Sequence, residues 1–372
     1  MTRRSKRYDN RQCERAIKRE QSLGSCNRVE EQVTYEKFYI AFRKAVKGVS
    51  WKVSAQNYIL NCFTNLVETI FKIFEMLEVR QGFIEFDLVE RGKLRHIKSI
   101  RIFERVIQAW ICKFILYPIL TYSLILDNSA SQKDKGTHFA IKRLEKHLRE
   151  YSKKYGNQGY ILLIDFKSYF ENIEHKQAKE LYRKDLTDKR LLKLADDFID
   201  AFGEKGLGLG SETSQMIAIA YCNRIDHWIK EVARIKGYGR YMDDSYLIHH
   251  DKEYLKQVYE KLKILYAEYG IKINQKKTYI TDLKHGFKFL KTRFHYGKNL
   301  EIVQKPCREC ITRERRKLKK QAKLVAKGEM TIKQVNCSFQ SWKGAIEHKK
   351  ARKTIHGMEQ LYNTLFKKEK EK

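Results

Sequence analysis

Two adjacent carboxylates, Asp243 and Asp244, lie between apolar runs in the segment Arg240-Tyr241-Met242-Asp243-Asp244-Ser245-Tyr246-Leu247-Ile248. Apolar residues alternate on both sides of a short polar turn, which predicts a β-hairpin with the two acids at its tip. Burying two like charges side by side costs free energy unless a cation offsets them. The pair is therefore a candidate site for divalent metal, and the alternative interpretation is a solvated Asp-Asp turn.

A third acid, Asp165, ends the apolar run that begins at Gly159 and is predicted to form a buried central strand. An isolated aspartate at the end of a strand is most often a cap. Together with Asp243 and Asp244, however, it predicts a site for two metal ions about 3.5–4 Å apart. Such a site activates a primer 3′-hydroxyl and neutralises a triphosphate and its departing pyrophosphate.

The composition favours nucleic acid as a partner. The 372 residues include 77 Lys and Arg against 45 Asp and Glu, a formal net charge of +32. A compact fold with this excess repels itself unless a polyanion is near, and contacts to phosphates release counterions. The apolar fraction of 42% and the aromatic fraction of 12% exclude a disordered basic tail and are more than a ribosomal or histone-like protein needs.

Other features indicate a cytoplasmic protein that does not enter a membrane. No apolar run reaches the roughly 18 residues of a membrane span. The basic N-terminus lacks an apolar segment behind it, so no secretory signal is expected. The eight cysteines are scattered, as expected of reduced thiols. Cys307 and Cys310 form a close pair, but a zinc site needs two further ligands and no second such pair exists, so we do not predict zinc there.

Periodicity places the elements that must position these acids. A helix is predicted over residues 103–115, closed before Pro118, and another over 137–151. Further predicted elements are helical stretches at 175–202 and 212–235, a helix over 253–268 capped by Gly270, and strands near 271–273 and 287–294.

A cationic helix is predicted after Thr312, and its basic residues are Arg313, Arg315, Arg316, Lys317, Lys319, Lys320 and Lys323. This density favours contact with a nucleic-acid duplex over a merely solvated helix face.

With these motifs in view, the chain resembles a bacterial reverse transcriptase over about residues 85–350. The resemblance rests on five segments in order: Asp165-Phe166-Lys167-Ser168-Tyr169-Phe170, Gly206-Leu207-Gly208-Leu209-Gly210-Ser211-Glu212-Thr213-Ser214-Gln215, Tyr241-Met242-Asp243-Asp244, Asn274-Gln275-Lys276-Lys277-Thr278 and Phe289-Leu290-Lys291. They are similar to the family's first aspartate motif, its template and nucleotide loop, its YxDD box, its N-x-x-K-T segment and its primer-grip hairpin.

The resemblance implies a role for each matching residue in the catalytic centre. Asp165 and Asp243 would be the principal ligands of two Mg²⁺ ions, or of Mn²⁺, with Asp244 in support and the Phe166 carbonyl completing one coordination shell. Phe170 would be a steric gate against ribonucleotides; the alternative is plain core packing. Lys277 would protonate pyrophosphate, and its alternative is a solvated surface lysine.

The resemblance also implies residues that bind substrate. Lys93 and Arg95 would clamp the triphosphate, and Arg105 fits a second fingers motif unless it pairs with Glu104. The nucleotide would also contact the residues Phe166, Phe170, Leu209, Gly210, Ser211, Gln215 and Tyr241. Many relatives carry Arg-Pro where this chain has Gln132-Lys133, so no contact is assigned to that segment.

Leu209 is a departure from many relatives, which carry Gln before the glycine of this loop. An apolar residue there, with Ser214-Gln215 closing the motif, resembles the reverse transcriptases of diversity-generating retroelements, in which the change accompanies low fidelity opposite template adenines. Leu209 cannot hydrogen-bond the nascent pair, so error-prone synthesis is expected. The alternative is a lineage difference without effect on fidelity.

The resemblance implies an α+β right-hand polymerase. The expected parts are a basic extension (1–45), fingers of helices and strands (46–158), an antiparallel-sheet palm (159–298) and a small helical, basic thumb (299–372). Expected partners are an RNA template or structured non-coding RNA, cDNA and dNTPs, and a basic accessory protein or a second copy of the chain is allowed.

The biological setting that the resemblance implies is a retroelement of a bacterium or phage. Three alternatives stay open: an anti-phage defence reverse transcriptase that makes cDNA with a dedicated RNA or without a template, an RNA-dependent RNA polymerase, and an intron-maturase-like RNA-binding protein with vestigial catalysis.

Overall fold

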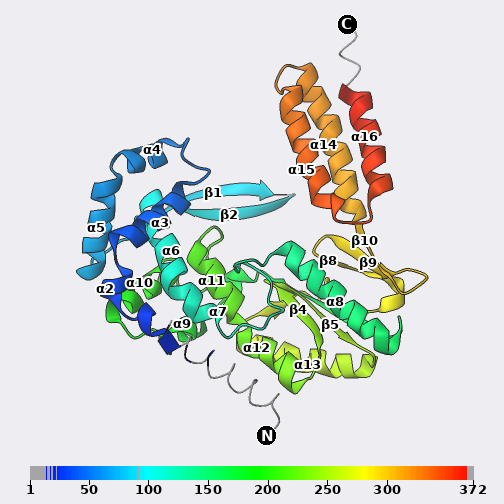
Figure 1. Cartoon of the computed structure of the whole chain (residues 1–372), viewed down its shortest axis with the longest axis horizontal. Coiled ribbons are helices and arrows are strands. Elements are labelled where there is room, and N and C mark those ends of the chain that lie inside the picture. The colour runs from blue at the N-terminus through cyan, green and yellow to red at the C-terminus, as the bar shows by residue number, and fades with distance from the viewer. Residues whose placement is uncertain (1–13, 15–16, 18–19, 22, 91, 367–372) are drawn as a thin grey trace.

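The computed structural model describes residues 14, 17, 20–21, 23–90 and 92–366. Along the chain, N-terminal helices and a β-ribbon are followed by a central sheet with helices and then by three long C-terminal helices (Figure 1). The predicted α+β class with antiparallel sheets is confirmed. Residues 1–13 of the predicted basic extension lie outside the described residues. No helix in the described part of the chain is long and apolar enough to cross a membrane.

The N-terminal helices pack on one another through aromatic rings. They are α2 (Val29–Gln32), α3 (Tyr35–Val46), α4 (Val53–Leu60) and α5 (Cys62–Phe74). Phe38 of α3 stacks on Trp110, with ring centroids 4.5 Å apart. The Trp110 indole also donates to the Gln32 carbonyl at 2.9 Å, which satisfies its buried N–H.

A two-stranded antiparallel ribbon follows, formed by β1 (Phe83–Glu90) and β2 (Lys93–Ile100). It extends from the N-terminal helices toward the side of the molecule on which the C-terminal helices lie (Figure 1). Phe83 stacks on Phe202 at 5.0 Å and so anchors the base of the ribbon.

The predicted helix over 103–115 is observed as α6 (Ile102–Ile111), but its expected end before Pro118 is wrong. The backbone continues through a π-helical turn (Cys112–Leu116) into α7 (Tyr117–Thr121). Pro118 lies in the first turn of α7 directly after the π-helical turn, and the change of register at that turn accommodates its missing backbone N–H. The helical path therefore passes the proline instead of stopping at it.

The central sheet is built around β3 (Tyr160–Lys167). This strand pairs with β5 (Asp244–His249) on one side and with β6 (Lys272–Ile273) and β7 (Tyr279–Asp282) on the other. β4 (Gly237–Tyr241) pairs with β5, and every pairing is antiparallel. The predicted central strand and the predicted Asp-Asp hairpin are confirmed.

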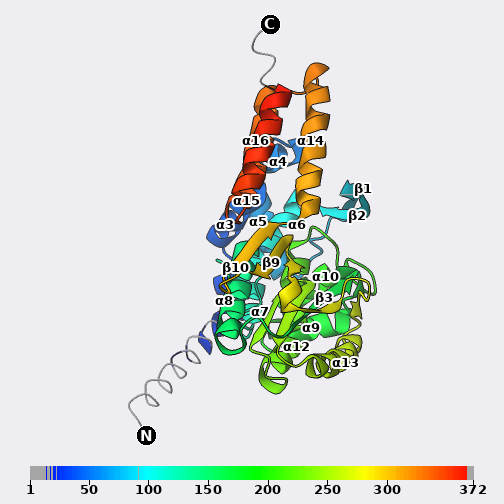
Figure 2. The same cartoon turned by 90° about the vertical axis from the view of Figure 1, so that its right-hand side faces the viewer.

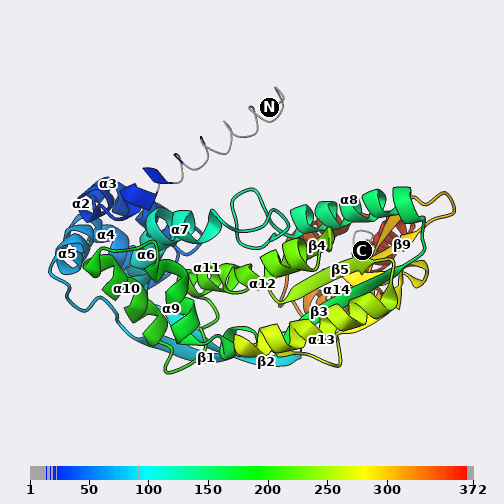
Figure 3. The same cartoon turned by 90° about the horizontal axis from the view of Figure 1, so that it is seen from below.

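Both faces of this sheet are covered, which explains why β3 is apolar along its length. Leu162 and Ile164 join the main core, whereas Ile161 and Leu163 join a second core on the other face. α8 (Thr137–Tyr155) and α13 (Lys252–Glu268) lie on opposite sides of the sheet (Figure 3). The predicted left-handed residue after α13 is observed at Gly270, with φ 68°.

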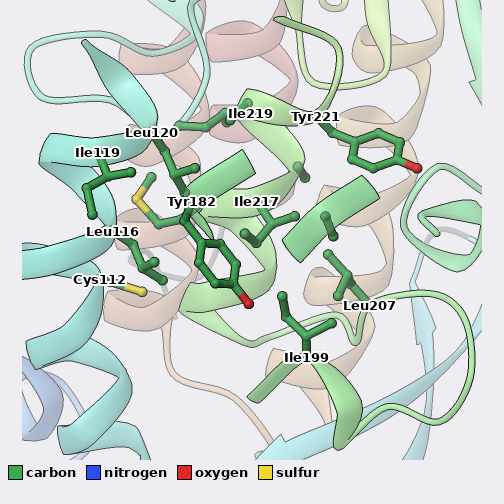
Figure 4. Close-up of a cluster of buried hydrophobic side chains, with 14 of the residues drawn as sticks. Cys112, Leu116, Ile119, Leu120, Tyr182, Ile199, Leu207, Ile217, Ile219 and Tyr221 are labelled. Atoms are coloured by element: carbon green, nitrogen blue, oxygen red, sulfur yellow. The ribbon is translucent and has the colours of Figure 1, made fainter. Parts of the chain in front are cut away.

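The main core also holds the loop that carries the glycines. The helices of this core are α9 (His175–Arg183), α10 (Lys189–Asp200), α11 (Glu212–Tyr221) and α12 (Asn223–His227), with a π-helical turn at Trp228–Val232 and a short 3-10 helix at Phe170–Asn172. A second 3-10 helix, Leu283–His285, packs in the other core. The stretch predicted as helical at 175–202 is thus two helices. Figure 4 shows Leu207 of the loop among Ile199 and Ile217. This contact fixes the loop to α10 and α11.

The C-terminal part begins with a small sheet of β8 (Phe287–Phe289), β9 (Thr292–Tyr296) and β10 (Ile302–Pro306). The strand predicted over 287–294 is therefore a hairpin. Its turn residues Leu290 and Lys291 both have positive φ, 45° and 58°. β10 lies within the segment predicted as thumb, so the small sheet crosses the predicted boundary at residue 299. The division into domains stays a prediction.

Three helices complete the chain: α14 (Arg308–Ala326), α15 (Ile332–Glu347) and α16 (Arg352–Phe366). They stand apart from the central sheet in two perpendicular views (Figures 1 and 2). Their core is separate from the other two and contains Leu318, Val335, Phe339, Met358 and Phe366.

Candidate active site

The turn of the β4–β5 hairpin presents two of the three acids. Tyr241 pairs with Asp244 across a two-residue turn formed by Met242 and Asp243. Met242 takes a left-handed conformation, φ 55°, which a tight hairpin turn requires. Asp243 therefore lies in the turn itself, and Asp244 begins β5.

The third acid lies beside them on the neighbouring strand. Asp165 of β3 is directly opposite Asp244 of β5, and residues paired in this way have Cα atoms about 4.5–5.5 Å apart. The Phe166 amide donates to the Asp243 carbonyl at 3.2 Å. The structure thus brings Asp165, Asp243 and Asp244 together at one edge of the sheet.

The N-x-x-K-T segment holds Asp165 from the other side. Asn274 Nδ2 donates to Asp165 Oδ1 at 2.8 Å, and Lys277 Nζ lies 3.0 Å from Asp165 Oδ2. The Asp165 amide donates to the Thr278 hydroxyl at 3.2 Å, and the Asn274 amide donates to the Asp165 carbonyl at 2.8 Å. All three named positions of this motif therefore orient one aspartate.

Asp243 and Asp165 add to the cost of ionising Asp244. Burial, followed by the charges of Asp243 and Asp165, raises the pKa of Asp244 from 3.8 to about 7, while Lys277 and Lys291 act in the opposite direction. The site therefore concentrates negative charge, which a divalent cation can offset.

A cavity of about 1040 Å³ opens above the acids. Its lining includes the predicted residues Asp165, Phe170, Tyr241, Asp243, Asp244, Lys277 and Arg313. Lys288 and Lys291 of the β8–β9 hairpin and Cys307 and Cys310 at the start of α14 also line it. The cavity is large enough for a nucleotide and meets both acids and cations.

The acids fit a Mg²⁺ site by their chemistry, because carboxylate oxygens are the hard donors that this ion binds. Within the described residues, no three His, Cys, Asp or Glu side chains already form a ligand cluster. Asp165 accepts one hydrogen bond at each carboxylate oxygen, from Asn274 and Lys277, and each oxygen keeps a second lone pair with which it can bind an ion. Cys307 and Cys310 belong to no such cluster among the described residues either.

Other predicted residues lie outside this cavity. Arg95 and Leu209 line a second cavity of about 290 Å³ between the β1–β2 ribbon and the glycine loop. Arg105 and Gly210 line a third, of about 210 Å³. Arg105 does not bind Glu104, which accepts hydrogen bonds from Gln108 and the Gln81 amide.

The remaining predicted substrate-binding positions stabilise the fold or are exposed. Ser211 caps α11 by accepting from the Ser214 amide, and Gln215 is exposed. The Phe166 ring is buried against Tyr266. Lys93 begins β2, but its side chain lies outside the described residues.

Sequence reasoning missed Arg240, whose side chain contacts the Met242–Asp243 turn from the interior of the protein. Arg240 is 1% exposed and forms an ion pair with the fully buried Asp226 at 2.7 Å. Its Nη1 donates to the Met242 carbonyl at 3.2 Å, and its Nη2 to the Ile219 carbonyl at 2.8 Å. A charged residue inside an apolar strand is the signal that could have revealed a buried partner.

The raised pKa of Asp244 predicts how stability depends on pH in metal-free buffer. Because its folded pKa of about 7 exceeds the ordinary 3.8, its stabilising contribution is complete below pH 3.8 and is lost as the pH rises through 7. Asp244→Asn stays neutral, so its urea midpoint should exceed that of the wild type by a margin that widens from pH 5 to pH 7 and is constant above. Urea titrations with EDTA measure this margin. A margin independent of pH would contradict the raised pKa of Asp244.

The family to which the chain belongs follows from comparison of its sequence. Residues 87–294, more than half of the chain, match the family described as Reverse transcriptase (RNA-dependent DNA polymerase). No curated protein matches the chain.

Among solved structures, the chain is similar to apo telomerase from Candida tropicalis, with 16% identity and a TM-score of 0.47, over 62% of this chain and 49% of that one. It is also similar to telomerase from Candida albicans in complex with a TWJ fragment of telomeric RNA, with 14% identity and a TM-score of 0.46, over 61% of this chain and 46% of that one. The chain thus spans about half the length of these telomerases. The sequence match contains both strands that carry the aspartates, and this chain belongs to the reverse transcriptase family of RNA-dependent DNA polymerases.

Proposed function

We propose that this chain copies an RNA template into cDNA by nucleotidyl transfer at a site for two Mg²⁺ ions, which Mn²⁺ can replace. The observation that carries the proposal is the meeting of Asp165, Asp243 and Asp244 at one sheet edge beneath a nucleotide-sized cavity. Asp165 and Asp243 would be the principal ligands, with Asp244 and the Phe166 carbonyl in support. When bound, the ions activate the primer 3′-hydroxyl and neutralise the triphosphate.

Cations around the cavity would bind the substrate and the product duplex. Lys277, which lines the cavity beside Asp165, would donate a proton to pyrophosphate. Arg95 on the ribbon would hold the triphosphate when the ribbon closes on it. Arg313 borders the cavity, and five further cations of α14 are exposed, namely Arg315, Arg316, Lys317, Lys319 and Lys320. These positive charges suit the phosphates of a primer–template duplex.

Phe170 would act as the steric gate. Its half-buried ring lines the cavity, and its carbonyl accepts from the Leu207 amide at 2.8 Å, which fixes its position. Phe170→Ala is expected to raise ribonucleotide incorporation at least about tenfold relative to deoxynucleotides, because the ring no longer excludes the 2′-hydroxyl. Single-nucleotide primer extension on an RNA template measures this ratio. If the wild type extended the primer with ribonucleotides but not with deoxynucleotides, the proposed function would be overturned.

Leu209 supports the further proposal that synthesis is error-prone, as in the diversity-generating group that its loop resembles. Leu209 is half-buried and lines the same cavity as Arg95, with no side-chain group that can hydrogen-bond a base pair. Leu209→Gln is expected to lower misincorporation opposite template adenine about two- to tenfold, the worth of one hydrogen bond. Sequencing of cDNA from both proteins tests this, and equal error rates would contradict it.

The partners follow from this activity and from the charge. We propose a dedicated RNA, as template or as structured scaffold, because the net charge of +32 exceeds what one primer–template cleft uses. Sequencing the nucleic acid that co-purifies with the protein identifies that RNA.

A further inference from the structure

A separate cavity of about 460 Å³ lies at the other end of the β4–β5 hairpin from the catalytic turn. It is enclosed by the C-terminal part of α8, the segment before β4 and the end of β5. α8 runs the whole way between the two sites. Thr137 at its start lies 3.4 Å from the Tyr241 hydroxyl, and Tyr155 at its end stacks on His250. A helix of 19 residues separates these ends by about 27 Å.

Aromatic rings form one wall of this distal cavity. Tyr155 and His250 stack with centroids 4.9 Å apart and planes 9° apart. Tyr151 lies 5.0 Å from Tyr155, and His249 lies 4.3 Å from His250. His250 is exposed and Tyr155 is half-buried, so this aromatic cluster is partly open to solvent, where the ring of a base can contact it.

Cations line the cavity from α8 and from the segment before β4. Lys154, Arg234 and Lys236 line the cavity and are exposed. Within the described part of the chain, Arg234 and Lys236 have no ion-pair partner. Lys154 lies over the Tyr155 ring at 4.9 Å. Of the described lining residues, Glu150 is the single acid, and it lies 3.6 Å from Lys146 on the same helix.

The segment before β4 holds its cations in place. Arg234 takes a left-handed conformation, φ 50°, and the next amide, of Ile235, donates to the Ile229 carbonyl at 3.1 Å. The Lys236 carbonyl accepts from Lys230 Nζ, whose ammonium also binds the buried Asp127 at 2.9 Å. The backbone that carries Arg234 and Lys236 is therefore held in place, which lowers the cost of ordering this segment around an anion.

We propose that this distal cavity binds a nucleotide unit of single-stranded RNA, with the base stacked on the Tyr155–His250 pair and its phosphates on Lys154, Arg234 and Lys236. Proteins bind single-stranded nucleic acid of any sequence with cations along the sugar–phosphate backbone and with exposed aromatic rings on which the bases stack. An acidic peptide would bind the cations but would make no stacking contact with the rings. The inference goes beyond the proposed polymerase function, since the site lacks the paired acids that catalysis needs and would anchor RNA only.

The first test measures affinity. Fluorescence anisotropy with a short labelled single-stranded RNA is compared for the wild type and Lys154→Gln/Lys236→Gln. Loss of two phosphate contacts should lower the slope of log affinity against log salt by about 1.4, or about 0.7 for each contact. Lys176→Gln/Lys189→Gln, which removes two exposed lysines from α9 and α10, is the matched control and should leave the slope unchanged. Equal slopes for all three proteins would overturn the proposal.

The second test separates stacking from charge. Tyr155→Ala should weaken RNA binding at least about fivefold, whereas Tyr155→Phe, which keeps the ring, should bind like the wild type. RNA carrying 4-thiouridine should cross-link to peptides that contain Tyr155 or His250. Cross-links confined to the aspartate cavity would overturn the proposal. Displacement of the RNA by a poly-glutamate peptide, together with wild-type RNA affinity of Tyr155→Ala, would also overturn it. These readouts need no DNA synthesis, so they stand or fall separately from the proposed polymerase activity.

Discussion

Asp243→Asn is expected to reduce the rate of DNA synthesis at least about a thousandfold, because stabilisation of the transition state by a metal ion is worth several kcal/mol. The substitution keeps the size of the side chain and the backbone contact between the Phe166 amide and the Asp243 carbonyl, but it removes a charge from the turn. Asp165→Asn should have an effect of the same order. Single-turnover primer extension with saturating dNTP and Mg²⁺ measures the rate.

A matched control comes from the other end of β5. Asp251 caps α13 by accepting from the amides of Glu253 and Tyr254, a position in which Asn serves equally well. Asp251→Asn should therefore keep the wild-type rate and stability. A rate for Asp243→Asn within tenfold of the wild type would contradict the two-metal assignment, because a ligand of the reacting ions cannot be lost at so small a cost.

Asp226→Ala is expected to destabilise the fold by about 3–5 kcal/mol, the cost of leaving a buried charge without its partner. Asp226 and Arg240 are both fully buried, and Asp226 also accepts from the Tyr238 hydroxyl at 2.5 Å. Burial alone would lower the pKa of Arg240, but Asp226 holds it well above its usual value, so the guanidinium stays charged. Urea denaturation measures the loss of stability.

Two further variants separate stability from the positioning of the turn. Asp226→Leu/Arg240→Met replaces the pair by apolar side chains and should recover most of the lost stability. It should not recover the rate of DNA synthesis, because the bond from Arg240 to the Met242 carbonyl is gone. Asp197→Ala, which breaks the partly exposed Lys193–Asp197 pair, should cost at most about 0.5 kcal/mol. Full activity in the double variant would show that Arg240 serves stability alone.

The acids could be predicted from sequence because their surroundings obey simple periodic rules. The strand through Asp165 is apolar on both faces, and the Asp243–Asp244 turn interrupts an apolar alternation, so local pattern was sufficient. In contrast, β7 is half-exposed along its length, and β10 pairs only with β9. Neither strand therefore shows the alternation of apolar and polar residues that marks a strand with one buried face. Their existence depends on neighbours distant in the sequence.

Other features depend on backbone geometry or long-range contacts that a sequence does not display. The π-helical turn before Pro118 changes the register of the helix, so a rule for regular α-helices placed the end wrongly. The resemblance places Arg95 and Leu209 in one nucleotide site with the aspartates, but they line a different cavity. Whether the ribbon brings them together with the aspartates depends on its position relative to the sheet, which local pattern does not encode.

The self-contained core of α14–α16 has an evolutionary consequence. Leu318, Phe339 and Met358 pack only within this three-helix unit, so substitutions there leave the interior of the central sheet untouched. Natural selection can therefore lengthen, shorten or recharge these helices, which we propose hold the product duplex, while the strands that carry the three aspartates are inherited unchanged.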